Sequence, residues 1–159
     1  MTRRLVRRSS LWSSTGVWST LNIMNPVDTL LAFFNAINQD DPDRVAELMT
    51  EDHVFIDALG NSVNGREKMR AGWRAYFAMC PDYWVSHQDI FHTGNTVAVF
   101  GSVGGTIRVN GEWSPENKWQ TPAAWRAVVN NGLIQEFRVY ADNKPVYDIL
   151  AKSGKREAG

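Results

Sequence analysis

The chain has 159 residues, 43% of them hydrophobic and 21% charged, which fits one globular domain with a sizeable core. Charge balances overall, but residues 25–159 hold all 17 acidic residues and 13 of the 17 basic ones, and this acidic body argues against nucleic-acid binding. Cys80 is the only cysteine, so an intrachain disulfide and a cysteine-based metal site are excluded, and a reducing, cytoplasmic location is expected.

Residues 1–23 are rich in arginine and serine, contain no acidic residue, and are predicted to be a poorly ordered extension outside the fold. They are too short and too polar for a membrane span, and they match a secretory signal poorly. Three alternatives stay open: an organellar transit peptide, a natural start at Met24, and an ordered arm that packs on a partner subunit.

Three helices are predicted in the first half of the chain. Asn25-Pro26 combines a capping residue with a proline at the first helical position, which favours a helix to about residue 38. The same pattern at Asp41-Pro42 opens a short second helix through residues 44–49. Residues 66–79 are expected to form the third, with an apolar side made of Met69, Trp73, Tyr76 and Phe77.

Between the second and third helices, residues 53–57 alternate as in a strand, which places His53, Phe55 and Asp57 on one side. If helices cover that side, the Asp57 carboxylate is partly desolvated and its pKa is raised, which suits a general base near neutral pH. His53, on the same side of the strand, can share a ligand or a bridging water with it. The alternative is that Asp57 caps the turn at Leu59-Gly60-Asn61.

The second half of the chain is rich in strand-forming residues. Four runs are separated by the hairpin signals Gly94-Asn95, Asn110-Gly111 and Asn130-Asn131-Gly132; they cover residues 83–92, 96–108, 113–129 and 133–140. Helices followed by an antiparallel meander predict an α+β fold, in which a curved sheet covers a helical layer and leaves an open end. The glycines of the second run predict a bulge or bend there; they are Gly101, Gly104 and Gly105.

Several segments together resemble the NTF2-like superfamily, and more narrowly its branch of SnoaL-like polyketide cyclases and ketosteroid-isomerase-like proteins. They are Phe34–Asp43, Leu48–Asp57, Gly65–Glu67, Asn131–Ile134 and Tyr140–Asp142. The resemblance covers roughly residues 25–150 and implies a cone-shaped α+β barrel with a hydrophobic pocket, commonly a homodimer packed through the outer faces of the sheet. We therefore expect an NTF2-like domain over residues 24–151 and a flexible tail over residues 152–159.

The resemblance places Asp57 where ketosteroid isomerases keep their proton-shuttling aspartate. The tyrosine and the protonated acid that bind the enolate oxygen in those enzymes fall near Phe33 and Ala124, whose side chains cannot donate a hydrogen bond. Limonene epoxide hydrolase offers a second comparison. Arg108 matches its arginine, but Asn110 and Val139 stand where its two acids would be, so epoxide hydrolysis is the less favoured function.

The sequence therefore predicts a pocket for a small, mostly apolar molecule, with Asp57 and His53 as catalytic residues. The expected substrate contacts are Phe33, Phe55, Trp73, Tyr76, Phe77, Arg108, Trp119, Tyr140 and Asp142. Asp142 can equally form a turn with the residues that follow it. His87 and Asp89 are expected on the same face of their strand. They could form an acid–base couple, or they could belong to a solvated or dimer-facing surface of the sheet. No metal-ligand spacing or cofactor motif is present, so a reaction without a cofactor is expected.

The favoured function is a cofactor-independent isomerase, cyclase or lyase that uses Asp57 as general base on an apolar carbonyl-type substrate. The alternative is a non-catalytic ligand-binding or dimerisation module, since related folds carry both kinds of function. No membrane or nucleic-acid partner is expected.

Overall fold

The computed structural model describes residues 23–156, so the expectations for residues 1–22 lie outside the described part of the chain. The three predicted helices are present as α2 (Pro26–Asn38), α3 (Pro42–Glu47) and α4 (Arg66–Met79). Both predicted caps form, because the Asn25 side chain accepts a hydrogen bond from the Asp28 backbone N–H and the Asp41 side chain accepts one from that of Arg44.

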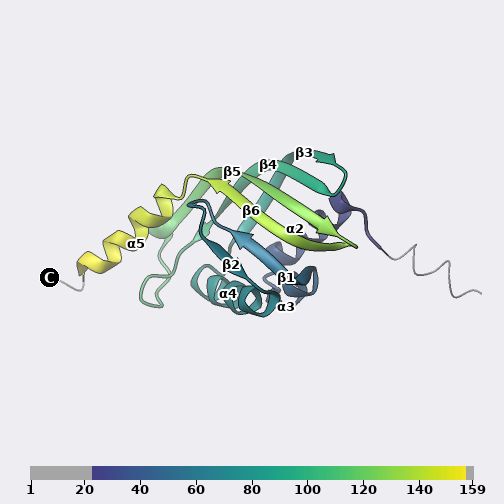
Figure 1. The fold of residues 1–159 in the computed structure, drawn as a ribbon. Coiled ribbons are helices and arrows are strands. Elements are labelled where there is room, and N and C mark those ends of the chain that lie inside the picture. Colours follow the sequence, from purple (N-terminus) through teal and green to yellow (C-terminus); the bar gives the residue numbers. More distant parts are fainter. Residues whose placement is uncertain (1–22, 157–159) are drawn as a thin grey trace, which may run out of the picture.

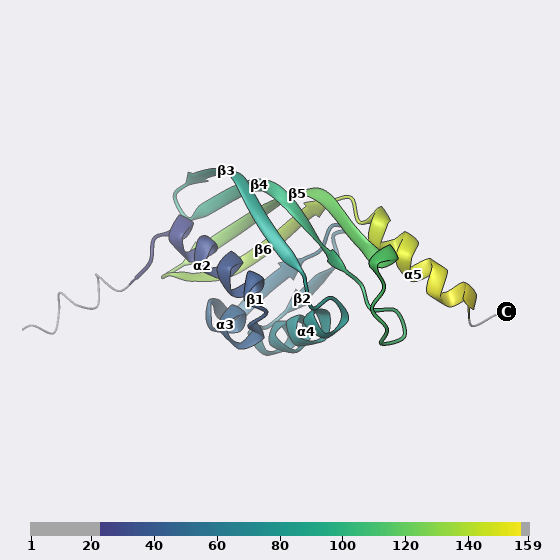
Figure 2. The same cartoon turned by 180° about the vertical axis from the view of Figure 1, so that it is seen from behind.

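Six strands make one sheet in the order β2-β1-β6-β5-β4-β3, and only the β1–β6 pair is parallel. The strands are β1 (Met49–Ile56), β2 (Ser62–Asn64), β3 (Trp84–Thr93), β4 (Thr96–Thr106), β5 (Lys118–Asn130) and β6 (Leu133–Ala141). Helices α2, α3 and α4 all lie on one side of the curved sheet (Figures 1 and 2). The predicted α+β arrangement is confirmed.

Strand β2, helix α5 and the 3₁₀ helix η1 were not predicted, and β4 (Thr96–Thr106) and β5 are shorter than expected. Strand β2 has only three residues, all exposed, so it carries no apolar alternation. Helix α5 (Lys144–Arg156) projects from the end of β6, and it includes residues 152–156 of the expected flexible tail (Figure 1). Strand β5 begins at Lys118, because the residues before it form a turn and the 3₁₀ helix η1 (Pro115–Asn117).

The core lies between α2 and the inner face of the sheet. Alternate residues of β5 are buried along its length, as expected for a strand with one covered face. Phe34 of α2 meets Trp125 edge to face at 5.0 Å between ring centroids, and Phe33 meets Phe137 in the same way at 5.0 Å. Such aromatic contacts fix the position of α2 across the sheet.

The predicted bend at Gly101 coincides with a bulge in β3. His87 pairs with Gly101 and Asp89 with Phe100, so the register skips one residue of β3. A side chain at position 101 would place its Cβ 1.9 Å from the Ser86 carbonyl oxygen, which only glycine avoids. Because neighbouring residues of β4 point to opposite faces, the bulge also turns His87 and Asp89 to opposite faces. The prediction that these two side chains share a face is wrong.

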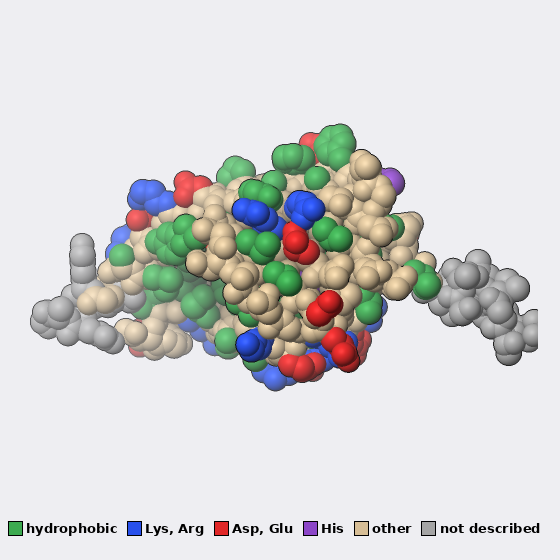
Figure 3. Space-filling view, in the orientation of Figure 1, with side chains coloured by type: hydrophobic (Ala, Val, Ile, Leu, Met, Phe, Trp, Pro, Cys, Tyr) green, Lys and Arg blue, Asp and Glu red, His purple; other side chains and the backbone are tan. Residues whose placement is uncertain are grey.

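The outer face of the sheet exposes several large aromatic side chains. Phe91, Phe100 and Tyr140 are 61%, 50% and 47% exposed, and the first two rings are in contact. Figure 3 shows hydrophobic side chains mixed with charged ones on one face of the molecule. Arg126 and Glu136, on neighbouring strands of the sheet, form an ion pair. The homodimer through this face stays a prediction. No helix within residues 23–156 is long and apolar enough to cross a membrane.

Candidate functional site

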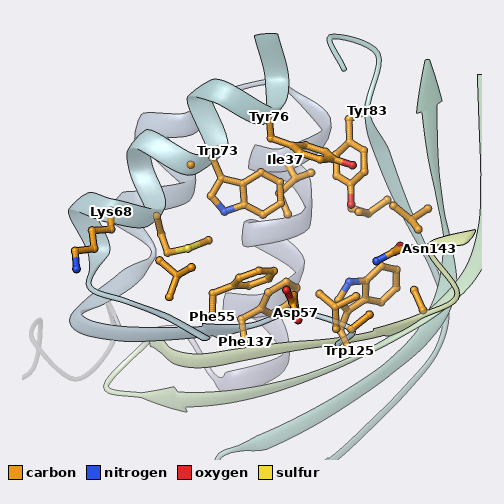
Figure 4. Close-up of a pocket in the computed structure, with 18 of the residues that line it drawn as sticks. Ile37, Phe55, Asp57, Lys68, Trp73, Tyr76, Tyr83, Trp125, Phe137 and Asn143 are labelled. Atoms are coloured by element: carbon orange, nitrogen blue, oxygen red, sulfur yellow. The ribbon is translucent and has the colours of Figure 1, made fainter. Parts of the chain in front are cut away.

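A cavity of about 390 Å³ opens between α4 and the inner face of the sheet (Figure 4). Its volume lies within the usual range for small-molecule sites. Most of its wall is apolar or aromatic. Its lining residues include Phe55, Asp57, Lys68, Trp73, Tyr76, Tyr83, Trp119, Trp125, Phe137 and Asn143. The cavity is therefore suited to a small, largely apolar molecule that meets a few polar groups.

Asp57 contributes the carboxylate of the cavity wall, but it follows β1 instead of ending it. The backbone N–H groups of Leu59 and Asn61 each donate to Asp57 Oδ1 at 2.9 Å, and Asn61 Nδ2 donates to Oδ2 at 3.0 Å. Asp57 therefore anchors the tight turn between β1 and β2, which was the alternative interpretation of its sequence. The same side chain also lies on the cavity wall (Figure 4).

The expected raised pKa of Asp57 is wrong in direction. Partial burial acts to raise the pKa, but hydrogen bonds from Asn61, Leu59 and Gly60 stabilise the charged carboxylate and outweigh it. The pKa of Asp57 is therefore lower than usual, and the group is an anion at neutral pH. Among the hydrogen bonds of residues 23–156, Oδ2 accepts one from the Asn61 side chain, which leaves it a lone pair for a further partner.

Aromatic side chains from α4 and the segment after it form the wall across the cavity from Asp57 (Figure 4). Tyr76 and Tyr83 are packed edge to face with ring centroids 4.9 Å apart. The Trp73 ring lies 6.2 Å from each of these two tyrosine rings, and Trp119 lies 6.3 Å from Tyr83. We call Tyr76 and Tyr83 the tyrosine pair.

Both hydroxyls of the tyrosine pair stay protonated over the physiological pH range. Burial raises the pKa of Tyr76 and that of Tyr83, Cys80 adds to the shift of both, and Tyr76 adds to that of Tyr83. Within residues 23–156 no hydrogen bond contributes to either shift, so neither hydroxyl is paired there. Trp73 is only 8% exposed, and its Nε1 is likewise without a partner there. This wall thus holds neutral hydrogen-bond donors that no protein group uses.

The predicted contact residues divide into those on the cavity and those behind it. Phe55, Trp73, Tyr76 and Trp119 line the cavity as expected. Phe33 and Phe77 do not; they are 0% and 5% exposed and belong to the core that supports the Trp73 ring.

His53, the second predicted catalytic residue, is a core histidine. It is fully buried and absent from the cavity wall, and its Nδ1 lies 2.7 Å from the Ile134 carbonyl oxygen. Burial lowers the pKa of its imidazole, although the Ile134 carbonyl and Asp52 oppose that shift. Four residues separate His53 from Asp57 along the chain, and Asp57 lies beyond the end of β1, in the turn that its side chain anchors.

Three further predicted contacts lie away from the cavity. Arg108 is exposed and is held through its backbone, whose N–H donates to the Met79 carbonyl. Tyr140 lies on the outer face of the sheet, with the Arg138 guanidinium 5.0 Å from its ring centroid. Asp142 accepts from the Lys144 backbone N–H at the start of α5, which is the turn given above as its alternative.

Sequence reasoning missed several lining residues. Tyr83 and Asn143 stand just outside regular elements, where periodicity does not give a side-chain direction. Trp125 and Phe137 could have been found from the alternation of their strands, since every second residue of β5 faces inward. Lys68 occupies the first turn of α4, on the exposed rim of the cavity.

A metal site does not form among the described residues. Within residues 23–156 no group of three or more histidine, cysteine, aspartate or glutamate side chains is placed to hold an ion. Cys80 is buried beneath Gly105, and burial together with the nearby Asp82 raises the pKa of its thiol to about 11.

Comparison with known proteins places the fold and the family. The family model described as SnoaL-like domain matches residues 30–137. IdmH from Streptomyces antibioticus, a candidate polyketide cyclase, is 25% identical with a TM-score of 0.67, over 80% of this chain and 99% of that one. No curated protein matches the chain in sequence.

Two more distant structures show the same fold. A protein from Catenulispora acidiphila with a ketosteroid isomerase-like fold, solved with trimethylamine, is 22% identical with a TM-score of 0.67, over 82% of this chain and 95% of that one. An LEH-like epoxide hydrolase from M. tuberculosis is 19% identical with a TM-score of 0.66, over 80% of this chain and 90% of that one. With the family match covering well over half of its residues, the chain belongs to the SnoaL-like domain family and has the NTF2-like fold.

Proposed function

We propose that this protein is a cofactor-independent isomerase, cyclase or lyase that binds a small, mostly apolar carbonyl compound in the cavity and uses Asp57 as general base. The observation that carries the proposal is the position of an ionised carboxylate on the wall of an aromatic cavity. The likeness to IdmH, a candidate polyketide cyclase, supports the same class of chemistry.

The lowered pKa of Asp57 restricts the substrates that such a base can serve. A weak base removes a proton only from a carbon whose carbanion is well stabilised, such as a carbon next to a carbonyl group. In the proposed step Asp57 Oδ2 takes the proton from that carbon, and the electron pair of the C–H bond moves into the carbonyl group to give an enolate. Return of the proton to another carbon completes an isomerisation. In a cyclisation the enolate carbon attacks a second carbonyl carbon of the same molecule, the C=O π bond of that group opens, and its oxygen takes the proton from Asp57.

The competing function is a non-catalytic ligand-binding module. It is favoured by the hydrogen bonds that tie Asp57 to the turn, because these give the carboxylate a structural reason to be there. The two functions share the cavity and differ only in whether Asp57 moves a proton.

Deuterium exchange separates the two functions. We would bind 2-tetralone, a two-ring enolisable ketone, in D₂O and follow loss of its proton signal next to the carbonyl by NMR. The wild-type protein should accelerate this exchange, and Asp57→Asn should lose about 10²-fold or more of the acceleration. Asparagine keeps an acceptor oxygen for the backbone N–H groups of Leu59 and Asn61, so the turn is preserved.

Asp142→Asn is the matched control, since Asp142 caps α5 outside the cavity and its variant should exchange the ketone like wild type. If 2-tetralone quenches tryptophan fluorescence on binding but its exchange is not accelerated, the catalytic proposal fails and the binding module replaces it.

A further inference from the structure

The cavity needs a way to hold a polar ligand atom, and the positions known from the resemblance do not supply it. Phe33 lies in the core with no exposed surface, and Ala124 alternates with the buried, inward-facing Ala123 and Trp125, so it points to the outer face. Neither side chain can donate a hydrogen bond. Any recognition of a ligand oxygen must therefore come from another part of the wall.

The tyrosine pair is the part of the wall equipped for this role. Both rings line the cavity across from Asp57, and Figure 4 shows the Tyr83 hydroxyl pointing into it, with the Tyr76 hydroxyl beside the Tyr83 ring. Within residues 23–156 no hydrogen bond occupies either hydroxyl, so both can donate to a ligand in the cavity. Trp73 Nε1, on the same wall, is a third unpaired donor and is almost fully buried. A ligand that supplies an acceptor here gains these hydrogen bonds.

The chemistry of the wall selects the kind of atom it can accept. The tyrosine hydroxyls stay protonated because burial raises their pKa, so they can donate over the whole physiological range. The only basic side chain of the cavity, Lys68, belongs to its exposed rim. The tyrosine pair therefore favours a neutral acceptor, or one on which negative charge develops during reaction, over a permanent anion.

We propose that the hydroxyls of Tyr76 and Tyr83 bind the carbonyl oxygen of a planar, aromatic or conjugated ketone that fills the cavity. This deepens the proposed function, on which it rests for the choice of a carbonyl ligand. The flat side chains around it, Phe55, Trp73, Trp119 and Trp125, give a ring system faces to pack against. The ligand's oxygen then lies on one side of the cavity, while the Asp57 carboxylate lies on the other.

Two probes of nearly equal shape isolate the oxygen contact. 2-Acetylnaphthalene carries a carbonyl group, and 2-isopropenylnaphthalene carries a CH₂ group in its place. Their dissociation constants are measured by quenching of tryptophan fluorescence on the wild-type protein, Tyr76→Phe, Tyr83→Phe and the double variant. The wild type should prefer the ketone, and each substitution should reduce that preference about 5-fold. Binding of the hydrocarbon should be unchanged, because phenylalanine keeps the ring.

Infrared spectroscopy gives a readout that a purely structural role would not move. The carbonyl stretch of bound 2-acetylnaphthalene should lie at lower frequency in the wild type than in the double variant, because hydrogen bonds weaken the C=O bond. Tyr147→Phe is the control, since Tyr147 is 46% exposed on α5 and absent from the cavity wall. It should match the wild type in both measurements.

The inference is overturned if the double variant binds the two probes with the same preference as the wild type, or if the carbonyl stretch does not shift. Neither measurement depends on Asp57 or on turnover. A failed exchange experiment with Asp57→Asn therefore leaves this test intact, and a failed test here leaves the role of Asp57 open to its own experiment.

Discussion

The two polar sides of the cavity differ in how their hydrogen-bonding groups are satisfied. On one side the Asp57 oxygens receive three hydrogen bonds from the turn that follows β1. On the other side the tyrosine pair and Trp73 Nε1 receive none within the described residues. The protein itself satisfies the first side, whereas the donors of the second side are left for a ligand or water. Unpaired donors therefore indicate where a ligand binds more directly than a carboxylate does.

The largest effect should come from removing the ring that supports the tyrosine pair. Trp73→Ala should lower the free energy of unfolding by about 3–5 kcal/mol, because it leaves a void against Phe77, Tyr76 and Tyr83. Urea denaturation measures this loss. Trp113→Ala is the matched control: Trp113 is 57% exposed, and its loss should change stability by no more than about 0.5 kcal/mol. Equal losses of unfolding free energy in the two variants would contradict a supporting role of the Trp73 ring.

A smaller, pH-dependent effect should come from the Asp57 side. Because the folded-state pKa of Asp57 is lowered, its carboxylate stabilises the fold above the unfolded-state pKa, and this contribution is lost as pH falls below about 4. The stability difference between the wild type and Asp57→Asn should therefore shrink as the pH is lowered through that range in urea titrations.

The effect of the turn on the pKa of Asp57 can also be measured directly on its carboxyl group. Asn61→Ala removes the hydrogen bond to Asp57 Oδ2, so the pKa of Asp57 should rise, as measured by NMR titration of the carboxyl carbon. A stability difference that is constant between pH 7 and pH 3, or a pKa unchanged in Asn61→Ala, would mean that the turn does not depend on the charge.

The smallest effect is expected on the side of the tyrosine pair. Tyr76→Phe and Tyr83→Phe each remove a hydroxyl that has no partner in the described chain, so the free energy of unfolding should change by less than about 0.5 kcal/mol. Thermal and urea unfolding without ligand measure the change. A loss of 1 kcal/mol or more would show that the hydroxyls already have a structural partner, and the comparison between the two sides would fail.

The local parts of this structure could be predicted from the sequence because local chemistry sets them. The caps at Asn25 and Asp41 depend on a side chain and the three residues after it, and both form as expected. The turn alternatives for Asp57 and Asp142 depend on equally short segments, and their hydrogen bonds are present.

The predictions that were wrong concern features set by contacts between strands that are distant in the sequence. The bulge opposite Gly101 separates His87 from Asp89, and packing against the neighbouring strand leaves His53 buried beside the Ile134 carbonyl. Neither can be read from one strand, because a bulge is a property of two strands together. Tyr83 was missed for a related reason, since only the packing of α4 against the sheet turns a residue between two elements toward the cavity.

The parallel pairing of β1 with β6 joins two segments that are far apart in the sequence, so β6 is synthesised well after β1. Phe55 lies opposite Phe137 and Ile56 opposite Arg138, immediately before Asp57 enters its turn. The nascent chain therefore carries an unpaired strand edge on β1 until the last strand has emerged. Such a contact between distant positions slows folding and exposes the edge to aggregation in the meantime. A chain that ends before β6 lacks Phe137, Val139 and Ala141, which line the cavity.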